Sequence, residues 1–158
     1  MSSKSPSPRT WNQLLSQTLR ALRRTRLRTA KDLAAAMNMP LRSYEHFEGG
    51  GGRLNLERIF QFAKAIDVDP YAILASVMIA SPRFAVRSAD NKFTQAFVIL
   101  LQEFDRTLGD DISTLETATV VAAFSQALDA LVAEARHKAD WRRTWLGENP
   151  TTDPDEET

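Results

Sequence analysis

The sequence predicts an all-α protein built as a head of five helices followed by a C-terminal helical hairpin. Apolar residues recur at helical spacing along almost the whole chain. Capping residues and prolines separate these runs, and no stretch shows the alternation typical of a β-strand. The chain has 158 residues, which is enough for one ordinary domain or two small ones.

The first three helices of the head, which spans residues 10–80, are indicated by their starts and by one turn. Capping boxes at 10–13 and 29–32 open the first and second helices, because Thr and Gln or Asp side chains can satisfy free amides there. Asn38 falls at a tight turn, where asparagine tolerates left-handed backbone. A short third helix is expected over 40–48.

The fourth and fifth helices each begin at a capping residue. Asn55 can cap the fourth helix, and Asp69 followed by Pro70 can start the fifth, because proline at the first helical position loses no hydrogen bond. The predicted inner stripe of the fourth helix consists of Leu56, Ile59, Phe60, Ala63 and Ile66. Residues 1–9 are predicted to be a disordered tail.

The second half begins with a predicted linker over 81–90, followed by the hairpin over 91–146 and a disordered acidic tail over 147–158. The first hairpin helix ends at Gly109, and a capping box at 113–116 opens the second. An apolar seam with spacings of three and four runs along the second helix for about two heptads. We expect the hairpin to form a homodimer through Phe97, Leu101, Phe104, Val121, Phe124, Leu128 and Leu131. The alternative is that it packs on the head within one monomer.

The formal net charge is zero, but the two halves of the chain differ in sign. Residues 1–80 carry 12 basic and 6 acidic residues, and residues 81–158 carry 8 basic and 14 acidic residues. Such asymmetry favours a half that binds a polyanion joined to a half with another task.

Several classes of protein are disfavoured by the composition. The chain has no cysteine, which excludes a disulfide scaffold, a cysteine zinc site and a thiol nucleophile. Its beginning lacks the apolar stretch of a signal peptide, and no run approaches the roughly 18 apolar residues of a membrane helix. No nucleophile–base pair or metal cluster is apparent. We therefore expect a cytoplasmic protein that is not an enzyme, with no cofactor, no metal and no membrane partner.

The stretch TAKDLAAAMNMPLRSYEHFEGG, with its two short helices and intervening turn, reads as a helix-turn-helix. Together with LNLERIFQFAKAIDVDPYAIL it resembles the lambda-repressor/Cro-like family, also called XRE, over about the first half of the chain. Glu48 matches the acidic residue near the end of the family's third helix. The chain departs from the pattern at Ala30, where the family often has glutamine, and at Pro40, where it usually has a serine or threonine cap.

The resemblance implies that the helix over 40–48 enters the major groove of duplex DNA, where each base pair presents its own donor and acceptor pattern. The residues placed at the base edges are Leu41, Arg42, Ser43, Glu45 and His46. Arg42 can bond guanine O6 and N7, Glu45 can accept from a cytosine amine, and Leu41 can touch a thymine methyl. The alternatives are that Glu45 pairs with Arg42 and that His46 is a surface residue or contacts a phosphate.

Contacts to the DNA backbone are expected from basic residues beside the helix-turn-helix and from the glycine loop after it. The expected residues are Arg24, Arg26, Arg28, Lys31, Gly50, Gly51 and Arg53. Cations next to a reading helix supply most of the affinity, and glycine amides can approach a phosphate closely. The loop lacks the Gly-Lys-Ser/Thr ending of a P-loop. The alternative is a flexible loop that touches nothing.

These features predict a sequence-specific regulator of transcription, a repressor that binds a near-palindromic operator in double-stranded DNA as a homodimer. The alternative, from another class, is an antitoxin-like interaction protein that binds a partner protein through the hairpin and regulates its own gene through the head. A ligand sensor ranks lower, because the hairpin shows no convergent polar groups.

Overall fold

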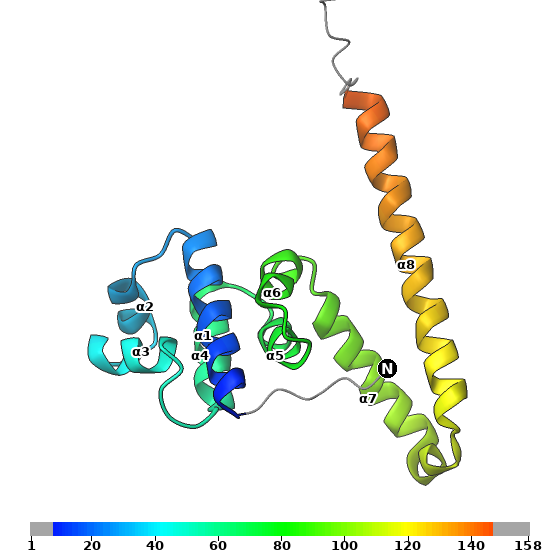
Figure 1. The fold of residues 1–158 in the computed structure, drawn as a ribbon, viewed down its shortest axis with the longest axis horizontal. Helices are drawn as coiled ribbons and strands as arrows, with labels where there is room; N and C mark the ends of the chain where they lie inside the picture. The colour runs from blue at the N-terminus through cyan, green and yellow to red at the C-terminus, as the bar shows by residue number, and fades with distance from the viewer. Residues whose placement is uncertain (1–7, 147–158) are drawn as a thin grey trace, which may run out of the picture. The chain divides into compact units, whose positions relative to one another are not determined.

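A computed structural model describes residues 8–146, and these residues are helical apart from short connections, with no strand among them (Figure 1). The all-α prediction is therefore confirmed. The chain divides into two compact units, residues 1–107 and 108–158. The elements in order are α1 (Pro8–Thr25), α2 (Ala30–Ala36), α3 (Leu41–Glu48), α4 (Leu56–Ile66), α5 (Pro70–Met78), α6 (Pro82–Ser88), α7 (Phe93–Leu108), the 3₁₀ helix η1 (Gly109–Thr114) and α8 (Thr117–Leu146).

The core of the first unit is made by apolar side chains from α1 to α6. Helices α5 and α6 pack on α1, while α2 packs on α3 and α4, and α3 also contacts α1 (Figure 1). The largest fully buried apolar side chains are Leu19, Leu22, Leu33, Tyr44, Ile59, Phe62 and Ile73. Helices α1 to α6 therefore each bury part of one face, as amphipathic helices do in small α-domains.

Local start and turn signals in the head are largely as the sequence predicts. Thr29 and Asp32 form a complete capping box at the start of α2. Asn38 adopts left-handed backbone, with φ of 52°, in the turn before α3. Asn55 accepts a hydrogen bond from the Arg58 amide at the start of α4, and Asp69 accepts one from the Tyr71 amide at the start of α5.

Two predicted helix starts are wrong. Helix α1 begins at Pro8, so Thr10 lies inside the helix and the last two residues of the predicted N-terminal tail are helical. The rest of that tail, and the predicted tail over 147–158, lie outside the described residues. Helix α8 begins at Thr117, because the Ser113 hydroxyl donates to the Asp110 carbonyl within η1 and caps no α-helix.

The predicted inner stripe of α4 is also partly wrong. Leu56 and Phe60 are 54% and 39% exposed, whereas Phe62, which the stripe omitted, is fully buried. The ring of Phe60 instead packs edge-on against Tyr71 at a centroid distance of 5.5 Å. Several registers of a 3.6-residue repeat fit an apolar run of this length, and the packing partners decide between them.

The predicted linker over 81–90 is a helix of the head. Pro82 stands at the first turn of α6, and Ala85, Ser88 and Ala89 are buried at helical spacing. The head therefore has six packed helices where the sequence predicted five. The Ser88 hydroxyl donates to the Phe84 carbonyl, so its polar group is satisfied inside the helix.

Helix α7 is attached to the head through a buried carboxylate. Asp69 Oδ1 accepts from the Tyr71 amide at 2.9 Å, and its Oδ2 accepts from the Gln95 amide at 2.8 Å. One side chain thus satisfies amides at the starts of both α5 and α7. The boundary between the two units falls at 107/108, so the predicted hairpin over 91–146 is divided between them.

Helix α8 is 30 residues long, and by length and composition alone it could cross a membrane, with a mean hydropathy of 1.3 over an 18-residue window. The average is raised by alanines between the larger apolar residues, whereas the expectation concerned an unbroken run of about 18 apolar residues, which polar residues interrupt here. Ser125, Gln126 and Asp129 lie in the same helix. An aspartate at the centre of a bilayer costs about 3 kcal/mol.

Candidate nucleic-acid interface

The pair α2–α3 is held together by its turn and by one buried face. Asn38 reverses the chain, and the Met39 amide donates to the Ala34 carbonyl at 2.9 Å. Helix α3 buries Tyr44 and Phe47, whose rings meet edge-to-face at 6.4 Å, and Phe47 meets Phe62 of α4 at 6.3 Å. These aromatic contacts fix the rotation of α3 about its own axis.

The opposite side of α3 faces outward. Leu41 is 42% exposed, Arg42, Glu45 and His46 are exposed, and Ser43 is half-buried. Neither Arg42 nor Glu45 forms an ion pair or a side-chain hydrogen bond with another described residue, so the alternative in which these two side chains pair is not observed. Pro40 precedes the helix without any side-chain cap. The predicted base-contacting residues therefore form one accessible surface.

Glu48 is buried at the end of α3 and is held by Arg23 of α1. The Arg23 Nε donates to Glu48 Oε1 at 2.9 Å, and its Nη1 donates to the Arg28 carbonyl at 3.3 Å. The carboxylate side chain is 5% exposed and the guanidinium side chain 22%. A buried carboxylate is stable when it is paired and hydrogen-bonded, so Arg23 fixes α3 on α1 rather than serving as a free cation.

Tyr44 lies beside this ion pair. Burial, reinforced by the negative charge of Glu48, raises the pKa of the Tyr44 phenol well above its ordinary value. Its hydroxyl has no hydrogen-bond partner among the described residues. The raised pKa keeps this side chain neutral inside the core even at alkaline pH, where an ordinary phenol would ionise.

A hollow at the start of α3 is lined by Pro40, Arg42, Ser43, His46 and Arg58. Arg58 comes from the first turn of α4, and the sequence interpretation did not include it. Two guanidinium groups, an imidazole and a hydroxyl around one hollow suit an anionic group such as a phosphate. The sequence could have indicated Arg58 through the Asn55 cap, because this cap places Arg58 in the first turn of α4.

The glycine loop after α3 is packed rather than free of contacts. At Gly50, with φ of +76°, an added Cβ would lie 2.5 Å from the Asn12 carbonyl oxygen of α1. At Gly51 an added Cβ would lie 2.3 Å from the His46 ring. The Asn12 amide also donates to the Gly52 carbonyl at 3.2 Å. Gly50 therefore has no room for a side chain, because the α1 backbone comes so close, and the loop is not free of contacts within the head. Its contact with DNA stays a prediction.

The basic residues expected at the DNA backbone divide into two groups. Arg24, Arg28, Lys31 and Arg53 are exposed, and none forms an ion pair with a described residue. Arg26 is different, because its guanidinium pairs with the Asp90 carboxylate and donates to the Asp67 carbonyl. Arg26 thus ties the end of α1 to the ends of α4 and α6, and its contact with a phosphate stays a prediction.

The residues expected to form the dimer interface are all accessible on their own helices. On α7 the exposed fractions are 43% for Phe97, 47% for Leu101 and 39% for Phe104. On α8 the residues Val121, Phe124, Leu128 and Leu131 are between 46% and 57% exposed. No side chain of α8 is buried. Each helix therefore presents an apolar row that a partner could cover.

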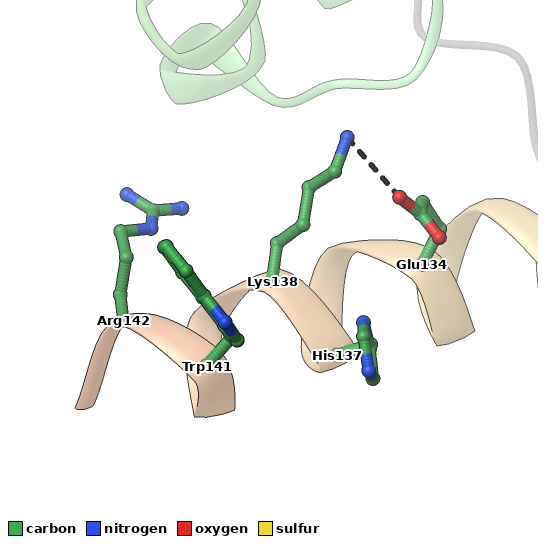
Figure 2. Close-up of a pocket in the computed structure, with 5 residues that line it drawn as sticks. All are labelled: Glu134, His137, Lys138, Trp141 and Arg142. Atoms are coloured by element: carbon green, nitrogen blue, oxygen red, sulfur yellow. Dashed lines mark ion pairs between the residues drawn. The ribbon is translucent and has the colours of Figure 1, made fainter. Parts of the chain in front are cut away.

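A second hollow lies on α8 and is lined by Glu134, His137, Lys138, Trp141 and Arg142 (Figure 2). Lys138 pairs with Glu134 at 3.1 Å, and the rings of Trp141 and Trp145 lie 5.5 Å apart. This end of α8 is thus both basic and aromatic.

Comparison of the chain with protein families, with curated proteins and with solved structures finds no match.

Proposed function

We propose that this protein is a sequence-specific DNA-binding regulator of transcription, acting as a homodimeric repressor on a near-palindromic operator. The observation that carries the proposal is the two-sided arrangement of α3. Its aromatic side is locked into the core by Tyr44 and Phe47, while Arg42, Glu45 and His46 are exposed on the other side. A helix fixed in this way can present polar side chains to the major groove.

Base recognition is assigned to the outer side of α3. Arg42 reads guanine through a bidentate hydrogen bond, and such a contact supplies roughly 1–3 kcal/mol of discrimination. Glu45 accepts from a cytosine amine, and Leu41 contacts a thymine methyl. Ser43 and His46 lie beside them and line the same hollow as Arg42.

Affinity is assigned to the surrounding cations and to the glycine loop. Arg24, Arg28, Lys31 and Arg53 are exposed without ion-pair partners in the described chain, so they are available to phosphates. Gly50 and Gly51 are kept in this group because they carry no side chain, although their amides already donate to the Phe47 and His46 carbonyls at 3.0 and 2.8 Å. Arg58 joins this group, because it lines the hollow at the start of α3.

Two heads are needed for a stable complex, because one head of this size buries only about 600–1,000 Å². The exposed apolar rows of α7 and α8 supply surfaces for pairing. A twofold pair would place two α3 helices at half-sites ~34–36 Å apart. Occupancy of the operator would then block the polymerase.

The test uses an operator selected by the wild-type protein from a randomised duplex pool. Arg42→Ala should weaken binding to this operator about 5- to 100-fold while binding to unrelated duplex persists, because only base recognition is lost. The control is Arg83→Ala, which removes an exposed arginine of α6 that has no ion-pair partner in the described chain. Equal affinity of Arg42→Ala and wild type for the operator would refute the assignment of Arg42. Failure of the wild type to select any sequence would refute the function.

A further inference from the structure

The hollow at the start of α3 brings basic side chains together without a counter-charge. Arg42 and His46 of α3 and Arg58 of α4 line it, together with Pro40 and Ser43. No carboxylate is among these lining residues, and none of the three basic side chains forms an ion pair or a side-chain hydrogen bond with a described residue. Two guanidinium groups around one hollow repel each other, and an anion between them reverses the sign of the interaction.

Other basic residues of the chain that lie near a carboxylate are paired with it. Arg23 donates to the buried Glu48, and in the hollow on α8 the ammonium of Lys138 pairs with Glu134. Arg58 is half-buried, yet it has no such partner in the described part of the chain. A cation that has lost part of its hydration gains more from a bound anion than a fully solvated one does.

The backbone adds to the positive potential of this hollow. Pro40 precedes α3, and no side chain caps the first turn of that helix. The amides that open a helix have no intrahelical partner, and the positive end of the helix dipole lies there. Arg58 stands in the first turn of α4, so residues from the first turns of two helices meet at the hollow.

We propose that this hollow binds one backbone phosphate of the duplex, held by Arg58 and His46, with the Ser43 hydroxyl as a further donor. The inference rests on the proposed DNA binding and names the phosphate site that fixes α3 in the groove. The planar guanidinium of Arg58 matches the geometry of a phosphate and donates charge-assisted hydrogen bonds to it. Arg42 lines the same hollow and reads a base, so the bound phosphate lies next to that base along the DNA.

The test replaces the phosphates of the operator selected by the wild type, one at a time, by neutral methylphosphonates. One position in each half-site should weaken binding of the wild type roughly tenfold or more, because charge-assisted hydrogen bonds are lost. This position should flank the base pair at which Arg42→Ala relaxes specificity. Arg58→Gln should lose most of the sensitivity at this position, because the partner of the phosphate is already absent. His46→Phe, which keeps a ring beside Gly51, should lose part of it.

The matched control in this assay is Arg28→Gln, which removes an exposed cation assigned to another phosphate. It should weaken binding to every duplex and keep the full wild-type loss at the position of the hollow. If Arg58→Gln loses the same factor as the wild type at every position, the hollow binds no phosphate and the proposal is refuted. An equal loss of sensitivity in Arg28→Gln would refute it as well, because the effect would then not belong to the hollow.

The dependence of binding on salt gives a second measurement, which uses unrelated duplex. Arg58→Gln should reduce the magnitude of the slope of log affinity against log salt by about 0.9, whereas Arg58→Lys should keep the wild-type slope because the charge remains. Arg83→Ala, which removes an exposed arginine of α6, should leave the slope unchanged. A wild-type slope in Arg58→Gln would overturn the proposal, and so would a reduced slope in Arg58→Lys, which would indicate a structural effect.

The outcomes for the phosphate site and for the regulator are separable, because the salt slope does not depend on sequence. A wild type that selects no operator refutes the regulator, while a smaller slope for Arg58→Gln on unrelated duplex still supports the phosphate site. Selection of an operator by the wild type, with an unchanged slope for Arg58→Gln, refutes the phosphate site and leaves the regulator intact.

Discussion

The four arginines of the run RRTRLRT lie in different environments in the folded chain. Arg23 pairs with the buried Glu48, and Arg26 pairs with Asp90. Arg24 and Arg28 remain exposed and form no ion pair with a described residue. The sequence shows four similar cations, and only the positions of Glu48 and Asp90 in space separate the paired arginines from those that we assign to DNA.

Tyr44 gives a prediction about the pH dependence of stability. Its pKa is raised in the folded protein above the ordinary value of 10.0. At pH values between this ordinary pKa and the raised pKa of the folded protein, the unfolded chain loses the phenol proton while the folded chain keeps it. The free energy of unfolding therefore falls as pH rises above about 10. Tyr44→Phe should remove this contribution.

The measurement compares urea unfolding of the wild type and Tyr44→Phe between pH 7 and 11. At pH 7 the two proteins should differ by about 1 kcal/mol or less, because the buried hydroxyl has no partner to lose among the described residues. Above pH 10 the wild type should weaken more steeply than the variant. Parallel pH profiles would contradict this account of Tyr44.

At the scale of elements, the loop after α3 joins the surface that we assign to DNA. Gly50 and Gly51 are held between Asn12 of α1 and His46 of α3. The sequence indicated a loop by its four glycines, but the residues that require them are distant in sequence or on the neighbouring helix. The backbone of the loop is thereby placed next to the outer side of α3.

This packing predicts unequal effects for two glycine substitutions in one loop. Gly50→Ala should lower the free energy of unfolding by about 2 kcal/mol or more, because strained backbone is combined with a clash against the Asn12 backbone. Gly52→Ala is the matched control, since its φ of +80° is similar but its nearest neighbour is 3.8 Å away. It should cost only about 1 kcal/mol. Denaturant unfolding measures both, and equal losses would show that the contact with Asn12 is unimportant.

At the scale of the whole molecule, the division of charge between the two halves gives the expected dependence on salt. Residues 1–80 carry an excess of basic residues, and Arg24, Arg28, Lys31 and Arg53 among them are exposed. Each phosphate neutralised by a cation changes the slope of log affinity against log salt by about 0.9. The number of phosphate contacts can therefore be measured one cation at a time.

Arg28→Ala and Arg26→Ala should differ in this measurement on unrelated duplex. Arg28→Ala should reduce the magnitude of the salt slope by about 0.9, because an available cation is lost. Arg26→Ala should leave the slope unchanged, because its guanidinium is already paired with Asp90. Fluorescence anisotropy at several salt concentrations gives the slopes. A smaller salt slope for Arg26→Ala than for the wild type would show that Arg26 also contacts a phosphate.

The sequence by itself determined the all-α class, the capping box at Thr29, the turn at Asn38 and the starts of α4 and α5. These features depend on residues close together in the chain, so local hydrogen bonds and backbone preferences are enough to specify them. The exposure of Arg42, Glu45 and His46 also followed from the spacing of Tyr44 and Phe47.

Only the tertiary structure decided which charged residues are paired, that 82–88 forms a helix of the head, and that Arg58 lies beside Arg42. It also decided that Phe62 rather than Phe60 enters the core, and that the chain divides at 107/108. These outcomes depend on contacts between segments far apart in the chain. The free energies of these long-range contacts are comparable to those of local backbone preferences. A local sequence pattern does not show which distant residue will make the contact.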